Sequence, residues 1–235
     1  MKRMFLRRLA RCGGGVALAA AAAASPALGA TSDPAGDFLG TYAGPQNADL
    51  DILGVGAFFD GSQIALTANL AGAAFATPNS LLAWGINRGS GTARFQFMGA
   101  PPPVGASVLF DALYVQFANG TGRIVVFNPM APPSITPVPG GAVTGNSITG
   151  FAPLALLPST GFAAADYTFT LWTRRRINAA FDTNNTEIAD FAPTIAAAVP
   201  EPASWVLLIL GFGAIGAGMR RRLLPKPSRA CGSAA

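Results

Sequence analysis

The sequence contains no histidine, and between residues 31 and 199 it also has no lysine and no cysteine. Histidine is the usual general base at neutral pH, and histidine and cysteine are the favoured protein ligands of transition metals. Their absence excludes a serine triad completed by histidine, a thiol nucleophile and a disulfide within this segment. A carboxylate pair for glycoside hydrolysis is still conceivable, but Glu187 is the only glutamate there. The sequence therefore predicts that the protein is not an enzyme, with a glycan-active enzyme as the least favoured alternative.

The excess of positive over negative charge is confined to the two ends of the chain. The formal net charge is +5, from 16 basic and 11 acidic residues. Five of the basic residues precede residue 12, and five more follow residue 219. Between residues 31 and 199, six arginines stand against ten acidic residues, so this segment has a net charge of −4. An acidic domain is a poor partner for nucleic acid, which we therefore do not expect.

The first 30 residues have the organisation of a secretory signal peptide. A basic start is followed by an alanine-rich run over residues 16–24 and by small residues from Ser25 to Ala30. Basic, apolar and small-residue regions in this order are typical of a segment that is removed on export. Cleavage after Ala27, Gly29 or Ala30 fits equally well. We therefore expect the remaining chain to act outside the cytoplasm.

Near the C-terminus, a Pro-Glu-Pro tripeptide precedes an apolar run and three arginines. The two prolines favour extended backbone, so a helix is expected to begin at residue 203. Residues 203–219 would form about 25 Å of helix, slightly less than the roughly 30 Å of a hydrocarbon core. Trp205 suits the outer interface, and the arginines suit the cytoplasmic face. The sequence predicts a transmembrane helix over 203–219 and a cytoplasmic tail over 223–235.

This order resembles the PEP-CTERM sorting signal of exported bacterial proteins. The resemblance implies that a membrane protease of the exosortase type recognises residues 199–222 and cuts near the Pro-Glu-Pro tripeptide. It further implies anchoring in the inner membrane with the domain in the periplasm, followed by release to the cell surface or extracellular matrix. An ordinary single-pass anchor in the lipid bilayer is the alternative. The residues that carry the resemblance are Val199, Pro200, Glu201, Pro202, Trp205, Gly211, Gly213, Arg220, Arg221 and Arg222.

Residues 31–176 have the pattern of a single antiparallel β-sandwich, either jelly-roll or Ig-like, and thus of an all-β domain. Short strand-like runs recur at intervals of roughly ten residues without an amphipathic helix. Asp60-Gly61 and Asn119-Gly120 separate two pairs of runs and favour tight hairpins. Proline excludes residues 132–139 from any central strand. The expected strands are 50–59, 63–70, 81–87, 93–98, 108–117, 122–127, 142–151 and 167–172, with the run 142–151 interrupted at Gly145-Asn146. Residues 177–198 are expected to form a linker.

The start of this domain carries Asp33-Pro34-Ala35-Gly36-Asp37 and then Asp49-Leu50-Asp51. Residues 33–61 resemble the opening of carbohydrate-binding sandwiches of the DOMON-like or glucodextranase C-terminal type. The resemblance implies calcium as a cofactor, with Asp33, Asp37, Asp49 and Asp51 as its ligands. Calcium takes six to eight oxygen ligands, which carboxylates and loop carbonyls can supply. The alternative is that these aspartates cap turns through hydrogen bonds to the backbone.

An aromatic face with neighbouring polar groups would suit a sugar ring. The candidate residues for such a face are Trp84, Asn87, Arg88 and Trp172. The alternative is that both tryptophans are core residues whose N–H groups find internal partners. Taken together, the sequence predicts an exported, non-enzymatic surface or matrix protein. The second interpretation is a calcium-stabilised module that binds exopolysaccharide.

Overall fold

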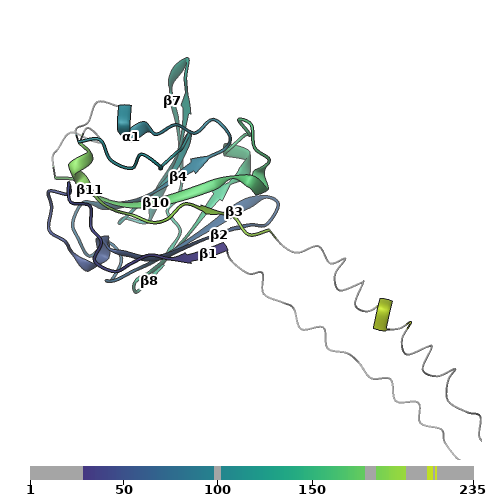
Figure 1. Ribbon diagram of the computed structural model, residues 1–235, viewed down its shortest axis with the longest axis horizontal. Coiled ribbons are helices and arrows are strands. Elements are labelled where there is room, and N and C mark those ends of the chain that lie inside the picture. The colour runs from purple at the N-terminus through teal and green to yellow at the C-terminus, as the bar shows by residue number, and fades with distance from the viewer. Residues whose placement is uncertain (1–28, 98–101, 178–183, 200–210, 214, 216–235) are drawn as a thin grey trace, which may run out of the picture.

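The computed structural model describes residues 29–97, 102–177, 184–199, 211–213 and 215. Within these residues the chain forms two antiparallel sheets that pack face to face (Figure 1). Helix is limited there to one short α-helix, a few 3-10 turns and residues 211–213 and 215. The prediction of an all-β protein is confirmed.

The first sheet has five strands in the order β1-β2-β3-β9-β8. The second sheet has the order β11-β10-β4-β5-β6-β7, and β12 also pairs with β10. The strands of the first sheet are β1 (Gly29–Ser32), β2 (Ile52–Phe59), β3 (Gln63–Leu70), β8 (Ala142–Thr144) and β9 (Ser147–Pro153). Those of the second are β4 (Ser80–Asn87), β5 (Ala112–Phe117), β6 (Thr121–Asn128), β7 (Ala131–Pro139), β10 (Thr168–Arg175), β11 (Ile188–Phe191) and β12 (Ile195–Ala196). The helical elements are α1 (Arg94–Phe97), η1 (Ala48–Leu50), η2 (Leu154–Leu156), η3 (Ala164–Asp166) and η4 (Asn185–Glu187).

The two predicted tight hairpins are present. Asp60 and Gly61 connect β2 to β3, and the Asp60 carboxylate accepts the backbone N–H groups of Ser62 and Gln63 at 2.8 and 2.9 Å. Asn119 and Gly120 likewise connect β5 to β6, and the Asn119 side-chain oxygen accepts the backbone N–H of Thr121. Both glycines have positive φ, at +101° and +77°, a conformation that costs glycine little.

The main core lies between the two sheets. Alternate residues of β3, including Leu66, meet alternate residues of β4 and β10, including Trp84 and Phe169, and all are almost fully buried. The indole N–H of Trp84 is directed to the side-chain amide oxygen Oε1 of Gln116 at 3.4 Å. Apolar burial of this kind contributes roughly 25 cal/mol per Å² and is the main force that joins the sheets.

A second apolar cluster covers the outer face of the seven-stranded sheet. It contains Leu81, Val115 and Trp172 and is overlaid by α1, whose Phe95 ring lies 5.0 Å from the Trp172 ring. The sequence predicted a strand over 93–98, and this prediction is wrong for residues 94–97. A helical turn forms there because it places Phe95 on the apolar face. Residue 98 lies outside the described residues.

The predicted linker over 177–198 is also corrected, because residues 184–198 belong to the folded domain. β11 pairs with β10, and Ala198 bridges β2 through two backbone hydrogen bonds of 2.9 and 3.0 Å. The segment is alanine-rich, as a linker can be, but Ala189, Ala192 and Ala197 are buried in the domain. Residues 178–183 lie outside the described residues.

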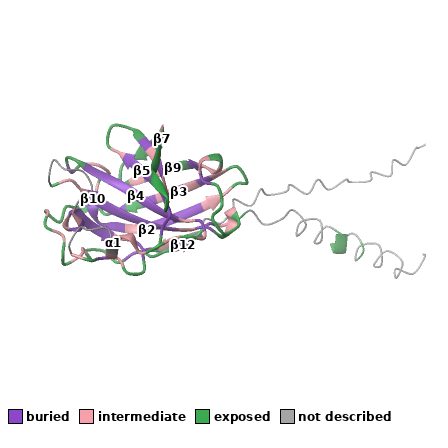
Figure 2. Ribbon diagram, turned by 90° about the horizontal axis from the view of Figure 1, so that it is seen from above, coloured by how far each residue is buried: buried purple, intermediate pink, exposed green. Residues whose placement is uncertain are grey.

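Besides β11, two further edge strands were not predicted. β1 pairs with β2 from Gly29 onward, and it therefore crosses the predicted boundary at residue 30. Signal-peptide cleavage after Ala27 would leave β1 whole, whereas cleavage after Ala30 would remove two of its four paired residues. β7 contains the prolines of 132–139 and lies at the exposed edge of its sheet (Figure 2), so the exclusion of this segment from central strands is confirmed.

Most of the predicted targeting segments fall outside the described residues. These include residues 1–28 and, in the C-terminal tail, Pro200 to Trp205 and Arg220 to Arg222. Of the predicted span 203–219, residues 211–213 and 215 are described and helical. Among the residues that the structure describes, no helix has the length and apolar character to cross a bilayer.

Candidate functional site

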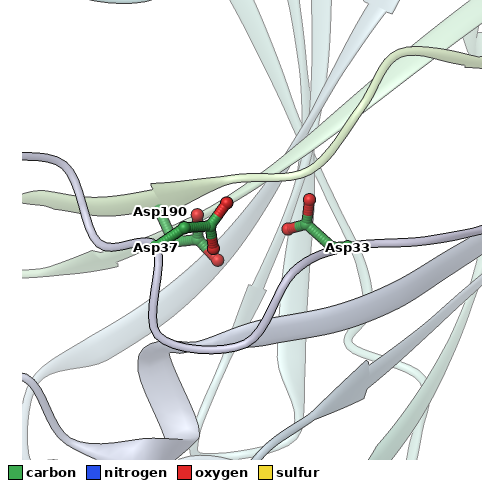
Figure 3. A group of neighbouring side chains, drawn as sticks. All are labelled: Asp33, Asp37 and Asp190. Carbon is green, nitrogen blue, oxygen red and sulfur yellow. The ribbon is translucent and has the colours of Figure 1, made fainter.

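Three aspartates from opposite ends of the domain converge on one point. Asp33 directly follows β1, Asp37 lies four residues later, and Asp190 belongs to β11. One carboxylate oxygen from each residue lies within 4.8 Å of the other two. Figure 3 shows the Asp33 carboxylate facing those of Asp37 and Asp190.

A fourth aspartate supports the loop that carries this cluster. Both oxygens of Asp51, which immediately precedes β2, accept the backbone N–H of Gly36 at 3.0 Å. Gly36 has a φ of +78°, which favours glycine at this turn. The Ile52 N–H donates to Asp190 Oδ2 at 2.8 Å. The start of β2 thus holds both the N-terminal loop and β11.

The electrostatics of the cluster disfavour its ionised form. Asp33 is only 9% exposed, and its Oδ2 atom is buried without a hydrogen-bond donor among the described residues. Burial raises the pKa of Asp33 to about 7, and the charges of Asp190, Asp37 and Asp51 add to this effect. Burial likewise raises the pKa of Asp190 to about 6, although the Ile52 N–H opposes the change. Carboxylates that are both desolvated and close together repel one another until a proton or a cation neutralises them.

The donor set fits a hard divalent cation. Every side-chain ligand is a carboxylate oxygen, which suits calcium and magnesium rather than metals that prefer nitrogen or sulfur. Asp33, Asp37 and Asp190 would hold the cation directly, with the Asp51 carboxylate beside them. Asp33 Oδ2, which is buried and accepts no hydrogen bond from the described residues, is the atom that most needs such a cation.

Asp49 does not join this cluster. Its two oxygens accept the backbone N–H and the hydroxyl of Thr77, so it fits the alternative of a turn-capping aspartate. Of the four aspartates predicted as ligands, Asp33 and Asp37 therefore remain in the cluster, Asp51 lies beside it and holds the Gly36 loop, and Asp49 is lost. Asp190 joins the cluster instead. Asp190 was missed because it lies far along the chain, inside the segment interpreted as a linker. Its one signal in the sequence is a lone carboxylate within the apolar run Ile188 to Ala192.

The four residues predicted to bind sugar do not form one exposed face. Trp84 is fully buried between the sheets, whereas Trp172 lies on the opposite face of the second sheet under α1. The Asn87 side-chain oxygen accepts the N–H groups of Gly89 and Gly91, so it caps the following turn. Arg88 is 1% exposed and donates to Asp111 at 2.9 Å. The prediction is corrected accordingly, because these side chains already have internal partners.

The buried Arg88–Asp111 pair has a measurable consequence for stability. Arg88→Met is expected to lower the free energy of unfolding by about 3–5 kcal/mol, because it leaves a buried carboxylate without its cation. Urea unfolding followed by fluorescence measures this change. A loss below about 1 kcal/mol, the value typical of an exposed pair, would contradict a structural role for Arg88.

Comparison with known families identifies the C-terminal segment. The family model described as the PEP-CTERM protein-sorting motif matches residues 198–222. The match confirms the resemblance seen in the sequence and implies export and membrane-associated sorting, with processing by exosortase, a membrane enzyme. No match to the chain was found among curated proteins or among solved structures. The likeness of residues 33–61 to carbohydrate-binding sandwiches stays a prediction.

Proposed function

We propose that this exosortase-targeted, exported chain is a non-enzymatic protein of the cell surface or extracellular matrix. Its C-terminal tail holds it in the inner membrane with the domain in the periplasm, until the membrane protease cuts near Pro200-Glu201-Pro202. The observation that carries this proposal is the PEP-CTERM match at residues 198–222. The match starts at Ala198, which is also the last residue hydrogen-bonded to β2.

The position of Ala198 gives the proposal a geometric consequence. Val199 alone separates the last hydrogen-bonded residue of the domain from Pro200. Ile195, the first residue of β12, and Ala197, which directly follows β12, are both buried. The chain is therefore held to the domain up to the start of the motif. The folded domain would therefore sit close to the membrane protease during processing. Cleavage at the motif would release a domain whose final strand is intact.

Replacing two residues of the motif tests the sorting proposal. Pro200→Ala combined with Glu201→Ala is expected to leave a longer, membrane-retained protein in a host that has the protease. Ser228→Ala, outside the matched segment, is the control and should be processed normally. Immunoblots of membrane and medium fractions measure both forms. Processing of the double variant at the normal rate would contradict a role for this motif.

The acidic cluster favours a second candidate function, a calcium-stabilised module that binds exopolysaccharide. Asp33, Asp37 and Asp190 supply three carboxylates from the two ends of the domain. A bound cation would neutralise them and connect the loop after β1 to β11. Titration of the full chain with neutral and acidic glycans, with and without calcium, tests the polysaccharide part. No response to any glycan of the panel would contradict polysaccharide binding, while the proposed metal site would stand independently of that result.

A further inference from the structure

Both terminal segments of the domain run along β2, in opposite directions. β1 is antiparallel to β2, and the Asp33 N–H that follows it donates to the Leu53 carbonyl oxygen at 3.0 Å. The C-terminal segment runs the other way: the Asp190 side chain accepts the Ile52 N–H, and Ala198 bridges the far end of β2. The acidic cluster therefore lies at the start of β2, and the two ends that processing would create lie at its end.

Both terminal segments contain short edge strands. β1 has four paired residues, and β12 has two. Terminal elements of this kind open locally at a free-energy cost well below that of global unfolding. A further bond between the two segments would therefore have a large effect on how often they open.

The loop after β1 and strand β11 contact each other beside the cluster. The Leu39 N–H donates to the Ala189 carbonyl oxygen at 2.9 Å. Asp33 is 9% exposed, and its buried Oδ2 atom has no donor among the described residues, although its carboxylate faces Asp37 and Asp190 (Figure 3). A buried oxygen of this kind, directed at two other carboxylates, is a ligand position for a cation.

A cation at this cluster would connect the two ends of the domain. Asp33 directly follows β1, whereas Asp190 belongs to β11. A ligand that binds both residues is released when either segment leaves, so it makes the two segments open together rather than separately. In its absence, the same carboxylates repel one another and favour opening. Cation binding is thus linked to the docking of both terminal segments.

We propose that calcium binding to Asp33, Asp37 and Asp190 controls a local opening in which β1 and residues 190–198 leave the domain together. This inference rests on the calcium site of the second candidate function and gives that site a regulatory role. Extracellular modules bind calcium with dissociation constants of about 0.1–1 mM. At such an affinity, the calcium around the exported chain decides whether its two processed ends stay docked along β2 or become accessible to proteases.

Hydrogen exchange measured by mass spectrometry on the full chain in phosphatidylcholine nanodiscs tests this coupling. Calcium is set at about 100 times the dissociation constant obtained from a titration of the same chain. Amides of β1 and of residues 190–198 should then exchange about 100-fold more slowly than in chelator, since the cation binds only the closed form. Both segments should slow by the same factor. The β8–β9 hairpin opens on its own at the other edge of the first sheet, so its exchange should not change.

Two carboxylate variants locate the effect. Asp37→Asn removes an exposed ligand and should reduce the slowing in both segments from about 100-fold to about tenfold or less, because calcium affinity depends on the number of charged ligands. Asp166→Asn removes an exposed carboxylate outside the cluster. It is the matched control and should keep the full effect.

The outcomes separate this inference from the metal site itself. Slowing in only one of the two segments would overturn the inference. Exchange that ignores calcium, while the melting temperature still rises with it, would do the same and leave the metal site in place. No response in either measurement would remove the metal site, and the inference with it. The sorting proposal is independent of all these results.

Discussion

Calcium added to the chelator-treated protein is expected to raise its melting temperature by about 5–10 °C. A ligand that binds only the folded state contributes about 2.7 kcal/mol at 100 times its dissociation constant. For a domain of this size, each 1 kcal/mol changes the melting temperature by about 2–4 °C. The physical reason is that the cation neutralises the carboxylates of Asp33, Asp37 and Asp190, which otherwise repel one another. Differential scanning calorimetry with and without chelator measures the effect.

Two aspartate variants separate a metal site from turn capping. Asp33→Asn should remove the calcium response while leaving the metal-free protein as stable as the wild type or more so, because it removes a source of repulsion. Asp49→Asn is the matched control, since its bonds to Thr77 are the same in both states. It should lower the melting temperature equally with and without calcium. An unchanged calcium response in Asp33→Asn, or none in the wild type, would contradict the metal site.

The stability of the metal-free protein is expected to decrease as the pH rises from about 5 to about 7.5. The folded-state pKa values of Asp33 and Asp190, about 7 and about 6, lie above the ordinary value of 3.8. The folded state therefore holds more protons than the unfolded state in this window. The contribution of Asp33 and Asp190 to the free energy of unfolding is fully present below about pH 4. It is lost as the pH rises through their folded-state pKa values. One pKa unit corresponds to about 1.4 kcal/mol, so a decrease of at least about 1 kcal/mol is expected.

Urea unfolding in the presence of chelator, repeated across this pH range, measures the decrease. Asp33→Asn should flatten the profile, because it removes the group with the largest upward pKa change. Saturating calcium should abolish or reverse the slope, since it binds the ionised carboxylates. Stability that increases steadily with pH in the metal-free protein would show that the carboxylates are stabilised when ionised, which contradicts the repulsive cluster.

The sequence predicted those parts of the fold that depend on local patterns. Alternating apolar residues located β3, and Asp60-Gly61 and Asn119-Gly120 located two hairpins. It failed where tertiary contacts decide the structure. The segment containing β11 and β12 has small apolar residues that also suit a linker, and only the neighbouring β10 makes it a strand.

The candidate sites show the same division. Asp33 and Asp37 were predicted because a short motif carries both, whereas Asp190 comes from the other end of the domain and shares no motif with them. The sugar-binding prediction failed because alternation does not reveal which face of a strand is covered. Trp84 and Trp172 both lie in strands of one sheet, but the first faces the core and the second lies beneath α1.

The ends of the folded domain meet at one strand, which connects the fold to the sorting proposal. Gly29 of β1 pairs with Ala57 of β2, and Ala198 bridges the next residue, Phe58. The end of the predicted signal peptide and the start of the sorting motif therefore lie beside neighbouring residues of β2. Removal of both segments would leave a domain whose two termini are held by β2.

Mass spectrometry of the protein released into the medium tests the sorting proposal most directly. The proposal predicts a chain that begins between Leu28 and Thr31 and ends near Pro200-Glu201-Pro202, so that the whole folded domain is retained. Recovery from the medium of a chain that still carries residues 203–219 and the three arginines after them would contradict it.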